Sequence, residues 1–288
     1  MSLLGDALRG KTPFQKRLAG RMWQRALKPV ASSGTPLVVF AIPLVSRRRA
    51  SDWDQVSSNL AATLGSLRRQ TSDQWVAYVC GQDRPRDVAF DTQVQFLPFG
   101  GGDKFYDKGD KRLAMLDTAV RDLAGRDGYY AQFDADDLLH PEVVRHVIEE
   151  DNGRGYVIDT GYMADLAAPC VAPLRPGAPG STPDDLEADR AFWELCGSCV
   201  FARYDFRTQS LHWRRLLRRL KSHKRMVEVM AQHGLPLDPI PFPSGLYALN
   251  HGENMSRRRK RESWRLTYLR HHALPEVEAR RVLRDFGL

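Results

Sequence analysis

The sequence predicts an α/β protein with a mostly parallel central sheet flanked by helices and folded as a single domain. Two observations carry this prediction. Apolar runs of strand length alternate along the chain with segments in which apolar residues recur every three or four positions, and such alternation is typical of parallel α/β sheets. The composition, with 42% hydrophobic and 27% charged residues over 288 residues, is that of an ordinary globular domain.

The expected strands are short and apolar, as strands buried in a parallel sheet usually are. The first is the apolar run that begins at Leu37, and β-branched and aromatic residues favour the others. We expect strands at residues 37–42, 75–80, 94–97, 129–133 and 156–159.

The expected helices lie between these strands, and each carries an apolar stripe with helical spacing. Pro141 favours a helix start, because proline fits the first helical turn. The stripes are Val56, Leu60, Leu64 and Leu67; Leu113, Leu116, Val120 and Leu123; and Val143, Val144, Val147 and Ile148. From residue 167 to 185 the chain is rich in Pro, Gly and Ala, which predicts a long loop and a mobile lid over a site.

The two ends of the chain are basic and predict extensions of the main domain. We expect an amphipathic N-terminal arm over residues 1–33, the main domain over 34–256 and a helical C-terminal extension over 257–288. The most apolar stretch, residues 36–45, is about half of the roughly 20 residues that a membrane-spanning helix needs. No secretory signal is recognisable. We therefore expect a cytoplasmic protein, and the basic arm either packs on the domain or lies on the inner face of an anionic membrane.

Positive charge exceeds negative charge, with 43 Lys and Arg against 35 Asp and Glu and a net charge of +8. This excess favours anionic partners, among which are nucleotides, nucleic acid and acidic lipids. Nucleic acid is not expected, because aromatic residues do not interleave with the arginine runs as a recognition module requires. The four cysteines, at 80, 170, 196 and 199, are too few and too unevenly spaced for a disulfide framework, so we expect them to be reduced.

Three motif-like patterns lack the surroundings that their chemistry needs. Residues 5–12 match the sequence pattern of a P-loop, but no buried strand precedes them as the motif requires. Glycines 100–102 follow a strand, but no glycine occupies the last position of a dinucleotide-binding loop, shortly before Tyr106. The C-x-x-C spacing of residues 196–199 has no second pair, which favours small structural residues over zinc or redox chemistry.

The informative segment is an apolar strand that ends in three carboxylates, Asp134, Asp136 and Asp137, before a helix. In an extended chain the side-chain period is two, so we expect Asp134 and Asp136 to share one face and Asp137 to point away. Adjacent like charges at the carboxyl end of a strand are costly unless a cation offsets them. Oxygen ligands favour Mg²⁺ or Mn²⁺. The alternative is a cluster of helix N-caps.

With this motif, residues 36–256 resemble the GT-A glycosyltransferases, especially the large group that includes the family-two enzymes. The aspartate-any-aspartate signature of that family is present as Asp134-Ala-Asp136 in FDADDLLHP. Upstream, an amphipathic helix ending in LGSLRRQT and a strand WVAYVCGQD match the family's order and spacing. The resemblance implies a GT-A fold and the transfer of a sugar from a nucleotide diphosphate donor.

The resemblance also implies roles for individual residues on the donor side. Asp83 would hold the nucleotide base, with a simple turn as the alternative. Lys108 and Arg112 would face the donor diphosphate, with ordinary helix-surface positions as the alternative. His251 in HGENMS would complete the metal shell. The implied donor-binding residues are Pro43, Arg47, Asp83, Lys108, Arg112 and Asp134, and the implied metal ligands are Asp134, Asp136 and His251.

On the acceptor side, FWELCGSCVFAR resembles the family's acceptor segment. Trp193 would then be a platform for a sugar ring or, alternatively, a core residue. The usual acidic pair of the later helix is missing from SHKRMVEVMAQHG. The catalytic base is therefore open among Glu194, His223 and Glu228, of which Glu194 and His223 are the main candidates.

Together these features predict a metal-dependent hexosyltransferase, inverting by resemblance, that uses Mn²⁺ or Mg²⁺ and a nucleotide diphosphate sugar. A UDP-sugar is the first expectation and a GDP-sugar the second. The expected acceptor is a hydroxyl of a glycan or of a lipid-linked molecule, in cell-surface polysaccharide synthesis. Two other functions stay open: nucleotidyl or phosphoryl transfer on a carboxylate-bound metal, and noncatalytic binding of nucleic acid through the arginine runs.

Overall fold

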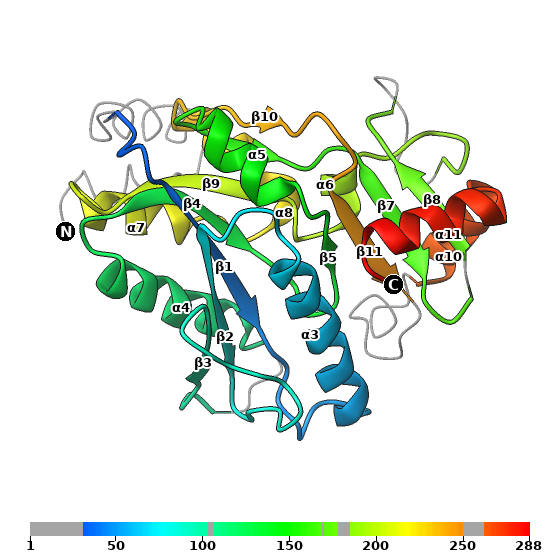
Figure 1. Ribbon diagram of the computed structural model, residues 1–288, viewed down its shortest axis with the longest axis horizontal. Helices are drawn as coiled ribbons and strands as arrows, with labels where there is room; N and C mark the ends of the chain where they lie inside the picture. Colours follow the sequence, from blue (N-terminus) through cyan, green and yellow to red (C-terminus); the bar gives the residue numbers. More distant parts are fainter. Residues whose placement is uncertain (1–30, 103–105, 169, 178–184, 250–261) are drawn as a thin grey trace.

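The computed structural model describes residues 31–102, 106–168, 170–177, 185–249 and 262–288. The N-terminal arm up to residue 30, the arginine run 257–261 and His251 lie outside the described residues. Within the described part, the chain forms a seven-stranded sheet, a four-stranded sheet and eight helices (Figure 1). The predicted α/β class is confirmed.

The large sheet has the strand order β10-β6-β9-β4-β1-β2-β3. All neighbouring strands run parallel except β9, which is antiparallel to both β4 and β6. The sheet is therefore mostly parallel, and all five predicted strands belong to it. Its members are β1 (Leu37–Pro43), β2 (Trp75–Gly81), β3 (Val94–Pro98), β4 (Asp127–Gln132), β6 (Gly155–Val157), β9 (Val200–Asp205) and β10 (Asp238–Pro239).

The smaller sheet has the order β5-β11-β7-β8, with β5 (Leu138–Leu139), β11 (Gly245–Leu249), β7 (Gly161–Asp165) and β8 (Cys170–Leu174). The prediction of one long loop over residues 167–185 is wrong in its first part, because β8 pairs with β7 in antiparallel register. Strand β8 lies at the edge of the sheet, where Pro173 is tolerated since it need not donate to a neighbour. The Pro- and Ala-rich composition of this segment is typical of a loop, so the sequence did not predict the strand.

The helices cover the sheets, and α3 shows how the sequence specifies them. Asp52 caps α3 by accepting hydrogen bonds from the N–H groups of Asp54 and Gln55. The predicted stripe of α3 is buried along its whole length. The helices are α3 (Trp53–Arg68), α4 (Lys108–Asp122), α5 (Val143–Glu150), α6 (Phe192–Leu195), α7 (Ser210–Leu217), α8 (His223–Gln232), α10 (Glu262–His271) and α11 (Glu276–Asp285).

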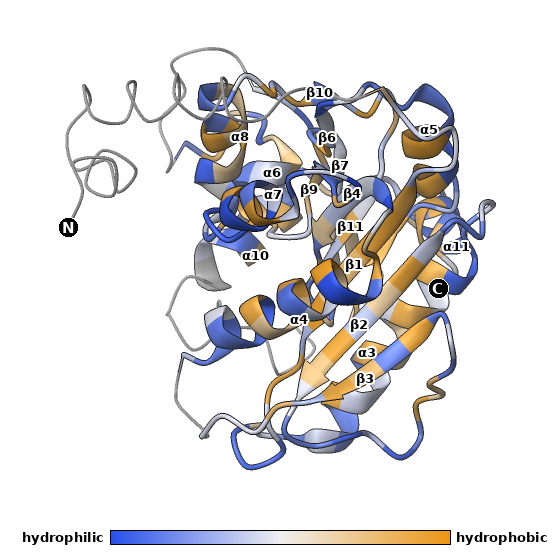
Figure 2. Cartoon of the chain, turned by 90° about the vertical axis from the view of Figure 1, so that its left-hand side faces the viewer, coloured by the Kyte–Doolittle hydropathy of each residue, from blue (hydrophilic) through white to orange (hydrophobic). Residues whose placement is uncertain are grey.

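The main core lies between the large sheet and its helices, where the strands are mostly hydrophobic (Figure 2). Phe40 at its centre makes edge contacts with the rings of Phe133 and Phe201. Gly128 adopts φ +154, and any Cβ there would collide with the backbone of Leu37. Glycine is therefore required where β4 approaches β1, and β4 carries the candidate site.

The C-terminal helices pack against the smaller sheet. A second apolar cluster includes Leu246 of β11, Ala279 and Val282 of α11, and Phe286, which directly follows α11. Tyr268 of α10 is fully buried. None of the helices among the described residues is both long and apolar enough to cross a membrane.

Candidate metal centre

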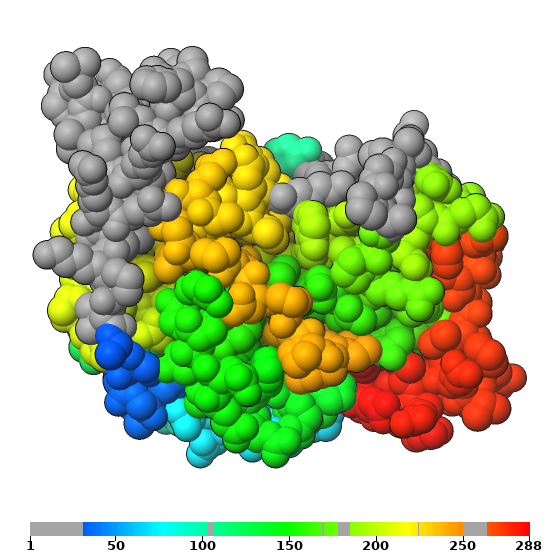
Figure 3. Space-filling model, turned by 90° about the horizontal axis from the view of Figure 1, so that it is seen from above, coloured from blue at the N-terminus to red at the C-terminus, as the bar shows by residue number. Residues whose placement is uncertain are grey.

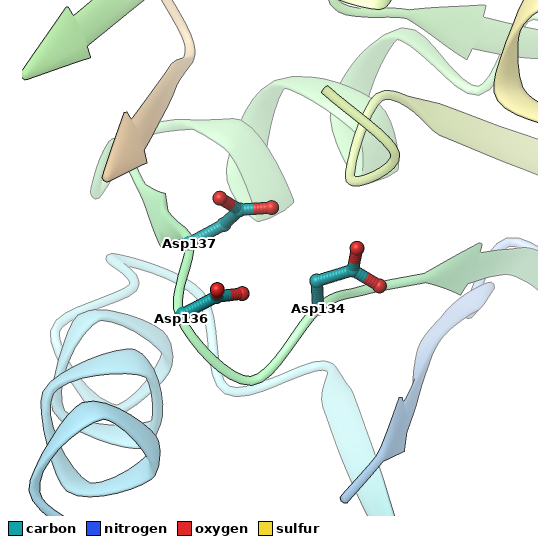
Figure 4. A group of neighbouring side chains, drawn as sticks. All are labelled: Asp134, Asp136 and Asp137. Atoms are coloured by element: carbon teal, nitrogen blue, oxygen red, sulfur yellow. The ribbon is translucent and has the colours of Figure 1, made fainter. Parts of the chain in front are cut away.

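Three aspartates lie close together where β4 ends. The strand stops at Gln132, and the chain then turns, with the N–H of Asp137 donating to the carbonyl of Asp134 at 3.4 Å. One carboxylate oxygen from each of Asp134, Asp136 and Asp137 lies within 4.8 Å of the other two, and the three side chains lie on the inner side of the turn (Figure 4). The expectation that Asp137 points away is wrong, because the two-residue period holds only in extended chain.

Asp137 is the most enclosed member of this cluster, with 2% of its surface exposed. Its Oδ2 accepts hydrogen bonds from Ser198 Oγ at 2.6 Å and from Cys196 Sγ at 3.1 Å. Its Oδ1 is buried and has no hydrogen-bond partner among the described residues. Burial, and then the charges of Asp136 and Asp134, raise the pKa of Asp137 well above its usual range. A cation between the three carboxylates would offset this cost.

The loop before β9 forms one wall of the cluster. Ser198 Oγ accepts from the N–H of Asp134 at 2.8 Å while it donates to Asp137, so a single hydroxyl positions both aspartates. A Cβ at Gly197 would lie 3.3 Å from Asp134 Oδ2, so only a very small residue fits without displacing that side chain. Burial raises the pKa of both Cys196 and Cys199, and the Cys196 thiol donates a hydrogen bond to Asp137.

Two cations from the start of α4 face the cluster. Lys108 Nζ lies 2.7 Å from Asp134 Oδ1, and Arg112 Nη2 lies 3.5 Å from the same oxygen. The two residues are four positions apart on one helix, so their side chains share a face. Burial alone would raise the pKa of Asp134, but the charges of Lys108 and Arg112 outweigh it and lower this pKa.

Helix α3 fixes the segment that leaves the cluster. Thr63 Oγ1 donates to the carbonyl of Asp137 at 2.9 Å, and Ser66 Oγ accepts from the N–H of Leu139 at 3.2 Å. Thr63 and Ser66 are fully buried. Polar residues inside the stripe of α3 therefore position the turn that carries the aspartates.

The loops after β1 and β2 are tied together beside the site. The backbone N–H of Arg47 donates to Asp83 Oδ2 at 2.8 Å, and Pro43 is opposite Cys80 in the sheet register. The carboxylate of Asp83 thus joins the two loops in this structure, which is compatible both with a turn and with a place at the rim of a ligand site.

Lys111 is a buried cation that the sequence analysis did not single out. It is 1% exposed, and its Nζ donates to the carbonyl of Leu44 at 2.7 Å and pairs with Asp107 at 2.9 Å. Gln82 donates to the same carboxylate at 2.6 Å. These contacts join the loop after β1, the loop after β2 and the start of α4. Lys111 therefore holds the loops that surround the candidate donor side.

The residues proposed for the acceptor side come from α6 and α8. His223 Nδ1 lies 2.6 Å from the carbonyl oxygen of Trp193, and a carbonyl can only accept, so Nδ1 carries the proton. The charge of His223 is among those that lower the pKa of Asp134, which brings His223 into the neighbourhood of the cluster. Glu194 follows Trp193 on the short helix α6, and both are partly exposed. His251 lies outside the described residues.

A further cation comes from the C-terminal helices. Arg265 of α10 lies over the ring of Tyr247 at 5.5 Å and donates to the carbonyl of Leu195 at 3.4 Å. Burial raises the pKa of Tyr247, and Asp137 and Asp136 add to this effect. Tyr247 and Arg265 therefore lie near the carboxylates, and no sequence motif distinguished either of them.

A separate hollow lies beyond β5 and includes none of the three aspartates. It has a volume of about 390 Å³ and lies between α5, the segment before β11 and the end of α11, with His140, His146 and Phe242 in its wall. Figure 3 shows α5 in green, the segment before β11 in orange and the C-terminal helices in red meeting on this face. The hollow contributes no residue to the carboxylate cluster.

Comparison with models of known protein families finds no match, and comparison with curated proteins finds none at a significant level. The case for a function therefore rests on the carboxylate cluster and the groups around it.

Proposed function

We propose that this protein is a metal-dependent glycosyltransferase of the GT-A type, which transfers a sugar from a nucleotide diphosphate donor to a hydroxyl group. One observation carries the proposal: three carboxylates gather within 4.8 Å of one another just after the central strand β4, beside Lys108 and Arg112. Open α/β sheets bind ligands at the carboxyl ends of their strands. The motif resemblance described above adds the class of reaction.

The residues present fit a divalent cation. The cluster offers only oxygen ligands, which Mg²⁺ and Mn²⁺ prefer, and the unpartnered Oδ1 of Asp137 supplies a buried acceptor for it. Asp134, Asp136 and Asp137 would hold the ion, and His251 is proposed as a further ligand by resemblance alone. A bound ion would act as a Lewis acid that offsets the negative charge of the departing nucleotide diphosphate.

The protein's own groups would do the remaining work on the donor. Lys108 and Arg112 reach the cluster from one side and would bind phosphate oxygens through charge-assisted hydrogen bonds. Ser198 keeps Asp137 in its orientation, and such supporting hydrogen bonds usually matter for metal affinity. Asp83, which holds the loop of Arg47, is proposed to contact the nucleotide base.

In the proposed transfer, the acceptor hydroxyl oxygen forms a bond to the anomeric carbon while the bond from that carbon to the diphosphate oxygen breaks. The hydroxyl proton passes to a base. His223 is one candidate, because a neutral imidazole whose Nδ1 donates to the carbonyl of Trp193 carries its acceptor at Nε2. Glu194 is the other candidate. Trp193 is proposed to lie beside the acceptor sugar.

Calorimetric titration with uridine diphosphate and guanosine diphosphate, each with and without Mn²⁺, tests the proposal. We expect one of the two nucleotides to bind only when Mn²⁺ is present. A nucleotidyl or phosphoryl transferase would instead bind and consume a nucleoside triphosphate. Binding of neither diphosphate in the presence of Mn²⁺ would overturn the proposal.

A further inference from the structure

The turn between α7 and α8, residues 218–222, concentrates positive charge on one side of the candidate site. Arg218 and Lys221 are exposed and Arg219 is half-buried. Among the described residues, no carboxylate lies within ion-pair distance of any of these three cations, although Arg225 of α8 approaches Glu228 at 4.0 Å. Within the described part of the chain, the turn is thus a basic surface without counter-charges.

Arg219 is the least compensated of these cations. Its Nη1 is buried and has no hydrogen-bond partner among the described residues. Burial, and then the charge of Arg225, lower the pKa of Arg219. Enclosing a guanidinium next to a second guanidinium is costly unless an anion binds between them. A group with several oxygens and a double negative charge, such as phosphate, matches the planar fork of arginine.

The position of this turn relates it to the acceptor side. Gln132 is the last residue of β4 and lies only two residues before Asp134. Its Nε2 donates to the carbonyl of Leu220 at 2.6 Å. The residue that follows the turn is His223, which contacts Trp193 of α6. Helix α8 contacts both α6 and β9, and α7 contacts β9. Lys108 and Arg112, by contrast, already contact Asp134.

We infer that the acceptor carries a phosphate group and that the α7–α8 turn binds this phosphate through Arg219 and Lys221. The inference rests on the proposed glycosyl transfer and narrows its acceptor to a phosphate ester or diphosphate ester whose hydroxyl lies close to the phosphate. The donor diphosphate and the acceptor phosphate would then be bound by separate sets of cations.

The test is calorimetric binding of inorganic pyrophosphate to the full chain at fixed ionic strength, without divalent ions. The variant Arg219→Gln/Lys221→Gln removes two charges from the turn. The control Arg126→Gln/Arg284→Gln removes two exposed charges elsewhere. We expect the turn variant to lose about tenfold or more in pyrophosphate affinity and the Arg126→Gln/Arg284→Gln control to stay within about twofold of wild type.

Two further measurements separate this inference from the proposed function. Binding of uridine diphosphate with Mn²⁺ should be unchanged in the turn variant, whereas failure of the wild type to bind either nucleotide diphosphate contradicts the proposed function itself. Sedimentation with phosphatidylglycerol vesicles separates an acceptor site from a membrane-docking surface. Equal pyrophosphate affinity in the turn variant and wild type would overturn the inference, as would a loss confined to vesicle binding. Lys221→Gln alone, at an exposed position, repeats the test if the double variant fails to fold.

Discussion

A single serine connects the two halves of the carboxylate cluster. Ser198 accepts from the N–H of Asp134 and donates to Asp137, at 2.8 and 2.6 Å. Because the hydroxyl does both at once, it fixes the distance between the turn and the loop before β9. Groups of this kind orient metal ligands without touching the ion.

Replacing Ser198 by alanine should therefore weaken nucleotide binding more than it weakens the fold. We expect Ser198→Ala to lower the affinity for uridine diphosphate with Mn²⁺ by about 10- to 100-fold, because Asp137 loses a hydrogen bond that holds it in place. Calorimetry measures the affinity, and circular dichroism reports the fold. Ser51→Ala, at an exposed position, is the matched control. An affinity equal to that of the control variant would show that Ser198 does not position the ligands.

At the scale of elements, α3 supports the segment that leaves the carboxylate cluster. Thr63→Val keeps the volume of the side chain but removes the donor to the carbonyl of Asp137. We expect the free energy of unfolding to fall by about 1–3 kcal/mol, since a buried carbonyl is left without its partner. Chemical denaturation measures the change, with Thr92→Val, at an exposed position, as control. Equal stability of the two variants would contradict a supporting role for Thr63.

The pairing of β4 with β9 depends on a buried ion pair. Arg203 of β9 pairs with Asp127 of β4, and neither side chain is more than 3% exposed. Burial would raise the pKa of Asp127, but hydrogen bonds from Ser33 and Arg203, with the charge of Arg203, lower it instead. This pair holds the antiparallel strand that brings the loop before β9 to the aspartates.

Removing the carboxylate should leave the buried Arg203 with only the weaker pairing to Asp151, at 3.5 Å. We expect Asp127→Asn to cost about 3–5 kcal/mol of unfolding free energy at neutral pH, with Asp73→Asn, at an exposed position, as control. A lowered pKa in the folded state means that this stability is present above the unfolded value of about 3.9 and is lost as pH falls through the folded value. The difference between wild type and Asp127→Asn should therefore shrink below about pH 4. A difference that is constant down to acidic pH would contradict the assignment.

Local periodicity predicted most of these elements, because it depends only on near neighbours along the chain. The stripe of α3 and all five strands expected in the large sheet are present. The orientation of Asp137 was predicted wrongly because strand β4 ends at Gln132, and no residue there signals the end. Strand β8 was not predicted because its pairing with β7, and not its own composition, makes this segment a strand.

At the scale of the whole molecule, the site gathers segments that are far apart in sequence. Gly197 and Ser198 reach Asp134 only because β9 runs antiparallel to β4, and strand direction cannot be derived from local pattern. Arg265 and Tyr247 meet through the packing of α10. The sequence could predict the aspartates and the cations of α4, which are near one another along the chain, but not these distant contacts.

The C-terminal helices complete the fold around the smaller sheet. Phe286 is 1% exposed and makes ring contacts with His140 and Tyr162. We expect Phe286→Ala to lower the free energy of unfolding by about 3–5 kcal/mol through the cavity that it leaves. Val277→Ala, at a residue that is 80% exposed, should change it by less than about 0.5 kcal/mol. Denaturant unfolding compares the two, and a small effect at Phe286 would show that the C-terminus does not stabilise the domain.

The central claim is that Asp134, Asp136 and Asp137 together hold a divalent ion that binds the nucleotide diphosphate. Electron paramagnetic resonance of Mn²⁺ during titration of the full chain tests this most directly, because free and bound Mn²⁺ give distinct signals. We predict one bound Mn²⁺ per chain, tighter binding when uridine diphosphate or guanosine diphosphate is added, and loss of this site in Asp136→Ala but not in the surface variant Glu278→Ala. Equal Mn²⁺ binding by Asp136→Ala and wild type would contradict the claim.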